Sequence, residues 1–484
     1  MTAEDTSPPP RPAPDSAVYD LAALRARLQG LRLEDNPAIL RQKSRDFFWY
    51  SPVLKRQLEA VTADLVVYAT TPEEVARVLA AAFALGIPVT PRGAGTGNYG
   101  QAMPLAGGVV LDLSGLGRVL EIGPGFVRAE AGAIIADIDA ATRVHSGQEL
   151  RLHPSTYRTA SIGGFIAGGS GGVGSITWGG LRDLGNVLAL TLLTMEAEPR
   201  RLRLSGDELA KVTHAYGTNG IIIEVEMPLA PAHDWVELMV GFDGFGAAAA
   251  YGNGLGEQDA ILKKLVSVIA APVPQDYFLR HRRYLPAGKH VALVMVAPIS
   301  LDATLAVTTR HGGQILFRSD TLGPEEAKGL PPLYELAWNH TTLRALRVDP
   351  AITYLQTLYP FPDQLSLVES IHARLGEEVP AHLEFVRFDG KVTCFGLPLV
   401  RFTTEERLEA IIALHEAAGI PVFNPHRYTL EEGGMKQTDA AQLAFKREAD
   451  PRGLLNPHKM IAWEDPAFDF AAARTYLFPG LRNS

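Results

Sequence analysis

The chain has 484 residues, which is enough for two or three domains with well-buried cores, and its 46% hydrophobic and 20% charged content is ordinary for a soluble protein. The net charge is −9 and no basic cluster is interleaved with aromatic residues, which argues against a nucleic-acid partner and requires any anionic ligand to be held by local groups. The single cysteine, Cys394, excludes an intramolecular disulfide, a zinc ribbon and iron–sulfur ligation by this polypeptide.

Residues Thr6 to Ser16 include five prolines, which predicts an extended, disordered leader over residues 1–20. The longest unbroken apolar run, near Val291 to Ile299, is far too short for a membrane span, and the first residues lack the apolar core of a signal peptide. We therefore expect a cytoplasmic protein without a membrane-spanning segment.

The first half of the chain predicts an α+β domain. Thr71-Pro72-Glu73-Glu74 opens a helix, apolar residues then recur at helical spacing, and Gly86 ends it. A short strand over residues 87–89 follows. Further strands are expected at 109–113, 127–131, 187–195 and 221–227 and a helix at 134–144, with a domain boundary near 228–231.

The strand that ends near Thr90 leads into a loop, residues 90–101, with glycine at 93, 95 and 97. Glycine tolerates positive φ and has no Cβ, so consecutive backbone N–H groups can curl around a diphosphate. Gly95–Gly100 and Gly169–Gly174 both satisfy G-x-G-x-x-G, yet neither is followed by the helix and acidic residue of a Rossmann unit. Residues 163–185 hold ten glycines, far above a background of about 7%, as expected where a flat, extended cofactor approaches the backbone.

The second half predicts alternating strands and helices that form a ferredoxin-like cap. Asp389-Gly390 between two apolar runs is a strong signal for a type I′ hairpin. The expected strands are 235–242, 291–298, 314–318, 382–388 and 391–402, and the expected helices are 259–269, 304–311, 333–346 and 362–375.

Residues from about Asp64 to Leu229 resemble the FAD-binding domain of the vanillyl-alcohol oxidase and p-cresol methylhydroxylase superfamily. The matching segments are Pro91–Gly97 (P-R-G-x-G-T-G), Ser161–Ala167 (T-I-G-G-x-x-A), Trp178–Asp183 (Y-G-x-x-R-D) and Tyr216–Glu224 (G-x-x-G-I-I-T-E). A C-terminal segment, Asp450–Met460, resembles the D-P-x-G-x-L-N-P-G-K of the glycolate oxidase and D-lactate dehydrogenase branch, with His458 in place of the last glycine.

This resemblance implies an α+β fold in which an FAD-binding domain over residues 21–230 carries a ferredoxin-like cap over residues 231–423. Residues 424–484 are then expected to return to the first domain. The implied cofactor is FAD and no metal is expected. The residues expected to hold FAD are Pro91, Arg92, Gly93, Ala94, Gly95, Thr96, Gly97, Asn98, Tyr99, Gln101, Pro154, Ser155, Thr159, Ser161, Ile162, Gly163, Gly164, Gly168, Gly171, Gly172, Gly220, Ile221, Ile222, Asn456 and Lys459.

Covalently flavinylated relatives carry a histidine after R-G-x-G and in some cases a cysteine in the second glycine-rich loop. Here Thr96 and the glycines of 169–174 occupy those places, while Cys394 belongs to the cap hairpin. We therefore expect dissociable FAD, with a covalent link through His426 as the alternative.

Catalytic groups are expected in the loop 424–436, which the resemblance brings next to the isoalloxazine. Tyr428, His426 and Arg427 can take a proton or hold an anion there. The alternative interpretation is a solvated connecting loop. A second candidate is the pair His382 and Glu384, which alternation places on one strand face, where a surface pair is equally expected.

The family's E-H-G-I-G and G-D-G-N-x-H segments are replaced by Leu430-Glu431-Glu432-Gly433-Gly434, which puts a metal and a 2-hydroxy-acid substrate in doubt. The resulting hypothesis is an FAD-dependent oxidoreductase that oxidises a small alcohol, hydroxy acid, phenolic or sugar-like substrate by hydride transfer to flavin N5, with oxygen or an electron carrier as acceptor. Two alternatives remain: a flavin subunit of an electron-transfer complex with an iron–sulfur partner, and a non-redox relative resembling alkyl-dihydroxyacetonephosphate synthase. The oligomeric state is not indicated.

Overall fold

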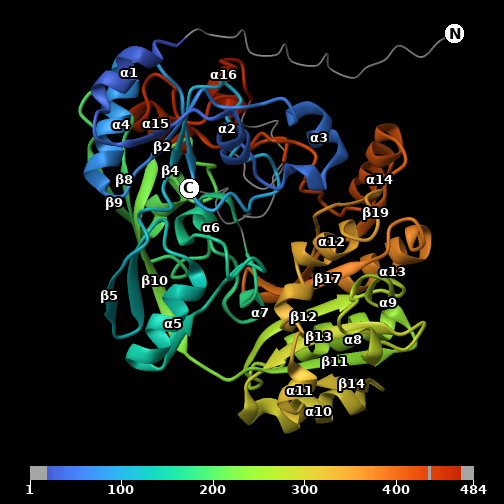
Figure 1. Ribbon diagram of the computed structural model, residues 1–484. Helices are drawn as coiled ribbons and strands as arrows, with labels where there is room; N and C mark the ends of the chain where they lie inside the picture. Colours follow the sequence, from blue (N-terminus) through green and yellow to red (C-terminus); the bar gives the residue numbers. More distant parts are fainter. Residues whose placement is uncertain (1–18, 170, 434–437, 470–484) are drawn as a thin grey trace, which may run out of the picture.

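The computed structural model describes residues 19–169, 171–433 and 438–469. Most of the expected leader, the end of the loop 424–436 and residues 470–484 lie outside this range. Figure 1 shows the blue-to-green first part of the chain beside the yellow-to-orange cap. Within the described ranges, no helix has the length and apolar character needed to cross a membrane.

The first part begins with a four-stranded sheet in the order β1-β2-β4-β3, in which β2, β4 and β3 run parallel. The predicted helix after Thr71 is present as α4, because the Thr71 hydroxyl accepts from the Glu74 N–H and Gly86 ends the helix at φ 68°. The elements are α1 (Leu21–Arg27), β1 (Arg32–Glu34), α2 (Pro37–Lys43), α3 (Pro52–Leu58), β2 (Leu65–Tyr68), α4 (Pro72–Leu85), β3 (Val89–Arg92) and β4 (Val109–Asp112).

A second, antiparallel sheet has the order β5-β6-β10-β8-β9, and β7 also pairs with the long strand β10. One face packs on α5 and α6 around a core that includes Val127, Ile138 and Ile166. The elements are β5 (Val119–Gly123), β6 (Phe126–Glu130), α5 (Ile135–Ser146), β7 (Gln148–Leu150), α6 (Ile162–Gly168), α7 (Ser175–Trp178), β8 (Ala189–Leu193), β9 (Arg201–Ser205) and β10 (Ile221–Pro231).

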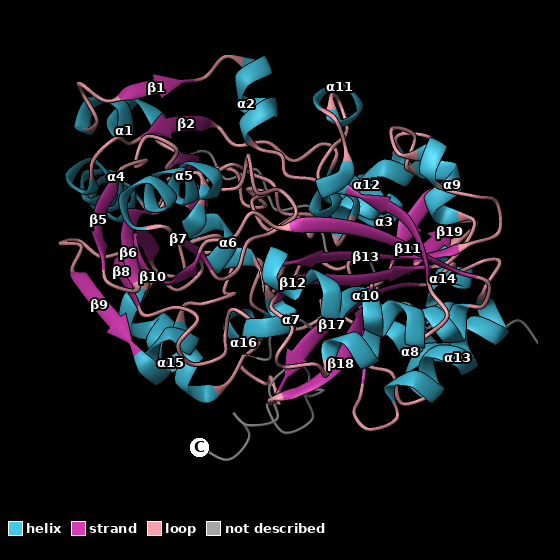
Figure 2. Cartoon of the chain, turned by 90° about the horizontal axis from the view of Figure 1, so that it is seen from below, coloured by secondary structure: helices cyan, strands magenta, loops and turns pink. Residues whose placement is uncertain are grey.

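The cap is built on a seven-stranded antiparallel sheet. Its first four strands follow the order β14-β11-β13-β12 with α8 and α10 as crossovers, which is the ferredoxin-like arrangement, and β17, β18 and β16 extend it. Helices α8 and α13 cover one face and α9 and α12 the other, as Figure 2 shows. The elements are β11 (Val236–Phe242), α8 (Phe245–Gly256), β12 (Lys263–Ile269), α9 (Val273–Tyr277), β13 (His290–Val296), α10 (Leu301–Arg310), β14 (Gln314–Arg318), α11 (Pro324–Ala327), α12 (Asn339–Leu346), β15 (Ile352–Tyr354), β16 (Thr357–Tyr359), α13 (Gln364–Leu375), β17 (His382–Phe388), β18 (Lys391–Gly396), β19 (Leu399–Arg401) and α14 (Glu405–Ala417).

The predicted helix over 259–269 is wrong. Residues Lys263–Ile269 form β12, which is buried along its whole length between β13 and β17, and the alanine-rich run before it forms α8 instead. A fully buried strand shows no alternation, so its apolar run can be mistaken for a helix. The hairpin prediction is confirmed, since Asp389 and Gly390 both have positive φ (48° and 75°).

The C-terminal segment, with α15 (Ala440–Ala449) and α16 (Ile461–Glu464), lies among the first elements of the chain, where Figure 1 shows it in red. The Val89 N–H donates to the Leu454 carbonyl (2.8 Å) and the Asn456 N–H donates back to the Val89 carbonyl (2.9 Å). We propose residues 21–230 with this segment as one domain and residues 231–423 as the other.

A buried ion pair holds the C-terminal segment against the first part of the chain. Lys446 Nζ lies 2.6 Å from Asp450 Oδ2 and donates to the Thr218 carbonyl at 2.7 Å, with the two side chains 2% and 0% exposed. Asp450 in turn accepts from the N–H groups of Leu454 and Leu455 (2.9 and 2.8 Å). The pair therefore connects α15 to the loop that precedes β10 and to the C-terminal segment that hydrogen-bonds to β3.

Replacing Lys446 by alanine is expected to destabilise the fold by about 3–5 kcal/mol, because the Asp450 carboxylate stays buried without its partner. Lys211→Ala is the matched control, since Lys211 pairs with Glu208 at the surface (3.1 Å, 32% and 53% exposed) and such pairs contribute about 0–1 kcal/mol. Thermal unfolding of both variants measures the difference. Equal midpoints would show that the buried pair does not anchor the segment.

Candidate functional site

A cavity of about 220 Å³, partly open to solvent, lies between the first part of the chain and the cap. Most of the residues expected to hold FAD line it, namely Pro91, Arg92, Gly93, Ala94, Gly95, Thr96, Gly97, Asn98, Tyr99, Gln101, Pro154, Ser155, Ser161, Gly163, Gly164, Gly168, Gly171, Gly220, Ile221 and Ile222.

The loop that follows β3 forms one wall of the cavity. Within the described part of the chain, the backbone N–H groups of residues 94–98 donate to no protein group, although these residues are partly or fully buried. Gly95 has φ 68°, a conformation that suits glycine. Unpaired backbone donors at neighbouring positions are the feature that binds a diphosphate, so the loop fits this part of FAD.

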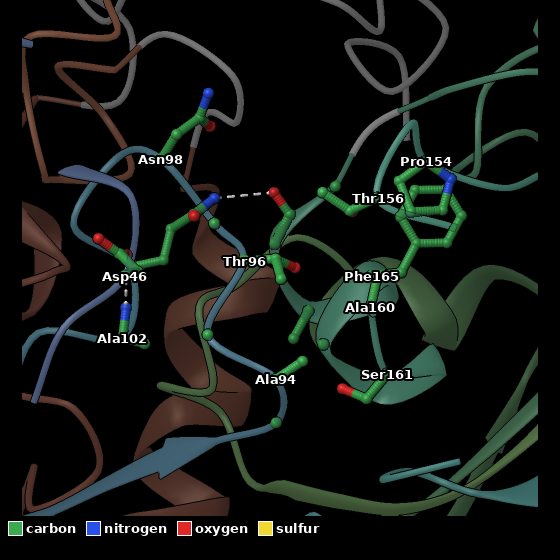
Figure 3. Close-up of a pocket in the computed structure, with 18 of the residues that line it drawn as sticks. Asp46, Ala94, Thr96, Asn98, Ala102, Pro154, Thr156, Ala160, Ser161 and Phe165 are labelled. Atoms are coloured by element: carbon green, nitrogen blue, oxygen red, sulfur yellow. Dashed lines mark hydrogen bonds between the residues drawn. The ribbon is translucent and has the colours of Figure 1, made fainter. Parts of the chain in front are cut away.

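The opposite wall comes from residues 154–171. Figure 3 shows Ser161 across the cavity from the loop residue Ala94, with its hydroxyl pointing toward the loop. The Ser161 hydroxyl is buried and has no hydrogen-bond partner in the ranges that the structure describes. A Cβ on Gly163 would lie 2.6 Å from the Ala131 Cβ and 2.9 Å from its carbonyl oxygen, so α6 packs against the end of β6 without room for a side chain.

Two residues expected to touch FAD brace the loop from behind instead. Asn456 Nδ2 donates to the carbonyls of Gln101 (2.8 Å) and Tyr216 (2.7 Å), and both of these residues line the cavity. Lys459 is fully buried and its Nζ donates to the Gly100 carbonyl at 2.6 Å. Burial lowers the pKa of Lys459 to about 7, while the charge of Asp46 opposes this shift.

Three further residues expected at the cofactor also stand outside the lining. Ile162 is a core residue of the second sheet, and the Thr159 hydroxyl donates to the Thr156 carbonyl at 3.2 Å. Gly172 packs directly on the His153 carbonyl, which leaves no space for a Cβ. They shape the loop that carries Ser155 and Ser161 without facing the cavity.

Sequence reasoning missed an N-terminal segment, Arg45–Tyr50, that contributes Asp46, Phe47 and Tyr50 to the lining. The Phe47 N–H donates to the Gly97 carbonyl (2.6 Å), and Figure 3 shows the Ala102 N–H donating to Asp46 (3.2 Å). Burial raises the pKa of Asp46 against these hydrogen bonds. Four consecutive aromatic residues after Asp46 were the signal available in the sequence.

The cap contributes Trp338, Asn339, His340 and Gln356. Gln356 Nε2 donates to Asn339 Oδ1 at 3.2 Å. Trp338 Nε1 and His340 Nδ1 are buried and have no partner in the described residues. Burial, helped by the charges of Arg344 and Arg347, lowers the pKa of His340 to about 4, so its imidazole is neutral near pH 7.

The pair His382 and Glu384 supports this wall from inside the cap. Its atoms Nε2 and Oε1 lie 2.7 Å apart and both side chains are buried, so it is not a surface pair. Glu384 Oε1 also accepts from the Trp338 N–H at 2.6 Å. Trp338 has φ 51°, which is rare for a bulky residue, and the buried carboxylate holds it in this conformation.

The structure does not bring His426, Arg427 and Tyr428 to the cavity lining. His426 is buried, and its two ring nitrogens contact Ser51 Oγ (2.7 Å) and the Tyr354 carbonyl (3.0 Å). Burial lowers its pKa to about 3. Arg427 pairs with Glu409 near the surface (3.1 Å), and the Tyr428 ring lies beneath Lys459 Nζ (5.1 Å to the centroid). The geometry does not favour the catalytic roles expected for these three residues.

Comparisons with known proteins agree with this geometry. Residues 63–203 match the family model described as FAD binding domain. The glycolate oxidase subunit GlcD of Bacillus subtilis is 25% identical over 428 residues, which cover 82% of this chain and 89% of that protein. These matches support the resemblance of the chain to the vanillyl-alcohol oxidase and p-cresol methylhydroxylase superfamily of FAD-binding proteins.

Other relatives match over shorter stretches. An uncharacterised FAD-linked oxidoreductase of Mycobacterium tuberculosis is 35% identical over 162 residues, covering 33% of this chain and 34% of that protein. The chain thus spans only about a third of this relative's length in the alignment. A solved structure of alkyldihydroxyacetonephosphate synthase superimposes with a TM-score of 0.68 at 15% identity, covering 92% of this chain and 86% of that one, and shows the shared fold.

The positions at which covalently flavinylated relatives carry a histidine or a cysteine hold other residues in this chain. Thr96 stands in the loop after β3, and Cys394 is buried in β18 at the core of the cap, where burial raises its thiol pKa. His426 is engaged with Ser51 and Tyr354, away from the lining. These placements favour dissociable FAD.

Acid precipitation of the purified yellow protein is therefore expected to release the flavin into the supernatant. Absorbance of the supernatant and mass spectrometry of the pelleted chain measure this. Yellow colour that remains with the pellet, or a chain heavier by one flavin, would contradict the dissociable cofactor.

Gly163→Val is expected to abolish FAD binding, because the added side chain collides with Ala131 and displaces α6 from the cavity wall. Gly117→Val is the matched control, since a Cβ there would approach only the Ser114 carbonyl, at 3.6 Å. The FAD content per chain after purification is the measurement, with circular dichroism as a check on folding. Full FAD occupancy in a folded Gly163→Val protein would sink the assignment of this wall.

Proposed function

We propose that this protein is an FAD-dependent oxidoreductase that oxidises a small hydroxyl-bearing substrate. The observation that carries the proposal is a single cavity that joins a backbone-lined wall fit for a diphosphate to a cap wall of aromatic and neutral polar side chains. A site with both parts can hold a dinucleotide and a second reactant side by side. Relatives named as glycolate oxidase subunit and D-lactate dehydrogenase support the same class of reaction.

FAD, when bound, supplies the acceptor for the hydride that leaves the substrate carbon. The residues that would hold it are the loop 91–101, Ser161 with Gly163 and Gly164, and Gly220–Ile222 beside Tyr216. Dioxygen or an electron carrier would serve as the final electron acceptor. We place the residue that takes the substrate proton on the cap side, because Asp46, the acidic residue among the described lining residues, already accepts from the N–H groups of Phe48 and Ala102.

His340 is the best candidate for this proton acceptor. Its imidazole lines the cavity and keeps one ring nitrogen free to accept a proton, since it is neutral at physiological pH. Trp338 and Phe165 line the same cavity and add apolar surface to it. Tyr50 lies on the same lining, but burial raises its pKa far above neutrality, so it serves as a hydrogen-bond donor rather than as a base.

Anaerobic mixing of the FAD-loaded protein with a panel of alcohols, diols and hydroxy acids tests the proposed function. Bleaching of the oxidised flavin band by any of them is the expected result. A protein that binds FAD yet is not bleached by any member of a broad panel would favour a non-redox role or a subunit that only passes electrons onward.

His340→Ala is expected to slow substrate-driven bleaching at least tenfold, about 1.4 kcal/mol of transition-state stabilisation, without loss of FAD. His145→Ala, an exposed histidine on α5, is the matched control. The pH profile gives a second readout: with a pKa of about 4, His340 stays in its base form as pH falls to 5, so the rate should stay nearly constant between pH 8 and pH 5. A base with an unperturbed histidine pKa of about 6.5 would instead lose most of its activity by pH 5. Stopped-flow rates at each pH decide between them.

A further inference from the structure

Strand β12 of the cap carries a lysine that is directed out of its own sheet toward the first part of the chain. The register of β12 against β13 shifts between Lys263 and Leu265, so Lys264 is an extra residue without an opposite residue in β13. Its carbonyl accepts instead from the N–H of Gly174, in the first part of the chain, at 2.7 Å. A β-bulge re-aims a side chain, and here it directs the Lys264 ammonium away from the cap.

The side chain of Lys264 forms a buried ion pair with Glu149 of β7. Lys264 Nζ lies 2.6 Å from Glu149 Oε1, and the two side chains are 6% and 3% exposed. The same oxygen accepts from the indole N–H of Trp235, the residue before β11, at 2.9 Å. Arg143 of α5 pairs with the other oxygen. The Glu149 carboxylate therefore receives two donors from the cap and one from the first part of the chain.

A second carboxyl group near this lysine is already engaged. Asp139 Oδ1 accepts from the Leu150 N–H at 2.7 Å, and Asp139 Oδ2 accepts from the Tyr157 hydroxyl at 3.1 Å. Burial raises the pKa of Asp139, while the charge of Lys264 opposes this shift. The direct ionic partner of the lysine is Glu149, so the contact between the two parts of the chain is specific in its partners.

The strand that carries Lys264 also supports the cap wall of the cavity. Three residues further along β12, Ser267 Oγ lies 3.2 Å from His382 Nε2. The same ring nitrogen lies 2.7 Å from Glu384 Oε1, which accepts from the Trp338 N–H. Because close-packed interiors transmit displacements, a shift of β12 relative to the first part of the chain should move Trp338 with it.

The glycine-rich wall of the cavity lies against the same strand. Val173 and His153 exchange N–H to carbonyl hydrogen bonds of 2.9 and 3.0 Å, and the next residue, Gly174, donates to β12. At the other end of this short segment, a Cβ on Gly171 would lie 3.6 Å from Trp338 Cη2. The glycine-rich wall and Trp338 therefore face each other across the boundary that the ion pair closes.

We propose that the Glu149–Lys264 pair is the contact that positions the cap over the cofactor cavity. Apolar burial is non-directional, whereas a buried ion pair is favourable only when its geometry is excellent. Neither residue is among the described residues that line the cavity, so both are positioning residues. The catalytic consequence rests on the proposed function: the pair keeps Trp338 and His340 in place opposite the glycine-rich wall.

A distance between the two parts of the chain tests the proposal. Ser205→Cys on β9 and Ala306→Cys on α10 place spin labels at exposed positions of the first part and the cap, and the buried Cys394 stays unlabelled. Double electron–electron resonance on the FAD-loaded protein should give one narrow distance distribution. Lys264→Met should broaden it at least twofold, and Lys264→Arg, which keeps the charge, should preserve it.

Lys289→Met is the matched control, because Lys289 pairs with Asp243 on the surface of the cap (2.7 Å) and should leave the distribution unchanged. Glu149→Gln is a second test variant that keeps the shape of the side chain, and it should broaden the distribution as Lys264→Met does. An unchanged distribution in both test variants, or equal broadening in the control, would overturn the proposal. Failure of both test variants to fold would also overturn it, since the pair would then hold the fold rather than the position of the cap.

Flavin measurements connect the position of the cap to the reaction. In Lys264→Met the FAD content per chain should stay unchanged, quenching of flavin fluorescence by iodide should rise at least twofold, and substrate-driven bleaching should slow at least tenfold. Lys264→Arg should restore both within threefold. Loss of FAD, or unchanged quenching and bleaching in a variant whose labels have moved, would contradict the positioning role. The distance measurement needs no turnover, so absence of bleaching in every protein would count against the proposed function alone.

Discussion

The arrangement of the FAD-binding part depends on a run of backbone N–H groups, residues 94–98, that the described part of the chain leaves without partners. Such groups cost free energy where a folded structure shields them from water, unless a ligand satisfies them, so the surrounding structure must hold them in place. Glycine at 93, 95 and 97 lets the main chain turn and lets the opposite wall approach closely. Because FAD binds only the native arrangement, its binding should stabilise the whole protein as well as fill the cavity.

The loop is held by segments that are far apart in the sequence. Phe47 and Asp46 bond to it from the N-terminal side, and Asn456 and Lys459 bond to its carbonyls from the C-terminal side. Asp46 and Lys459 are buried near each other, and each moderates the cost of burying the other's charge. The C-terminal return, anchored by Lys446, therefore has a direct part in shaping the cofactor site, although none of its residues named here lines the cavity.

Features that depend on local backbone chemistry could be predicted from the sequence. The start and end of α4, the glycine loop and the hairpin at Asp389-Gly390 all follow from a few adjacent residues. β12 was mistaken for a helix because burial on both faces removes the alternation that marks a strand. The roles expected for Tyr428, His426 and Arg427 rested on where a relative's segment would lie, and the direction of a side chain is decided by tertiary packing: here Ser51 and Tyr354 surround His426, and Glu409 draws Arg427 outward.

The two walls of the cavity differ in how they recognise a ligand. This difference explains why the cofactor could be predicted from the sequence and the substrate could not. The FAD side consists largely of backbone groups and glycines, which leave a motif in the sequence. The cap side consists of side chains from α12 and from the strand region near Gln356, held by the buried Glu384 through the Trp338 N–H. A single substitution at Asn339 or Gln356 can change its charge without disturbing the sheet beneath, because these positions face the cavity while Glu384 and His382 carry the support. The cap wall can therefore change its substrate while the FAD cradle stays constant, and substrate preference must be argued from the wall's own chemistry in each member of the superfamily.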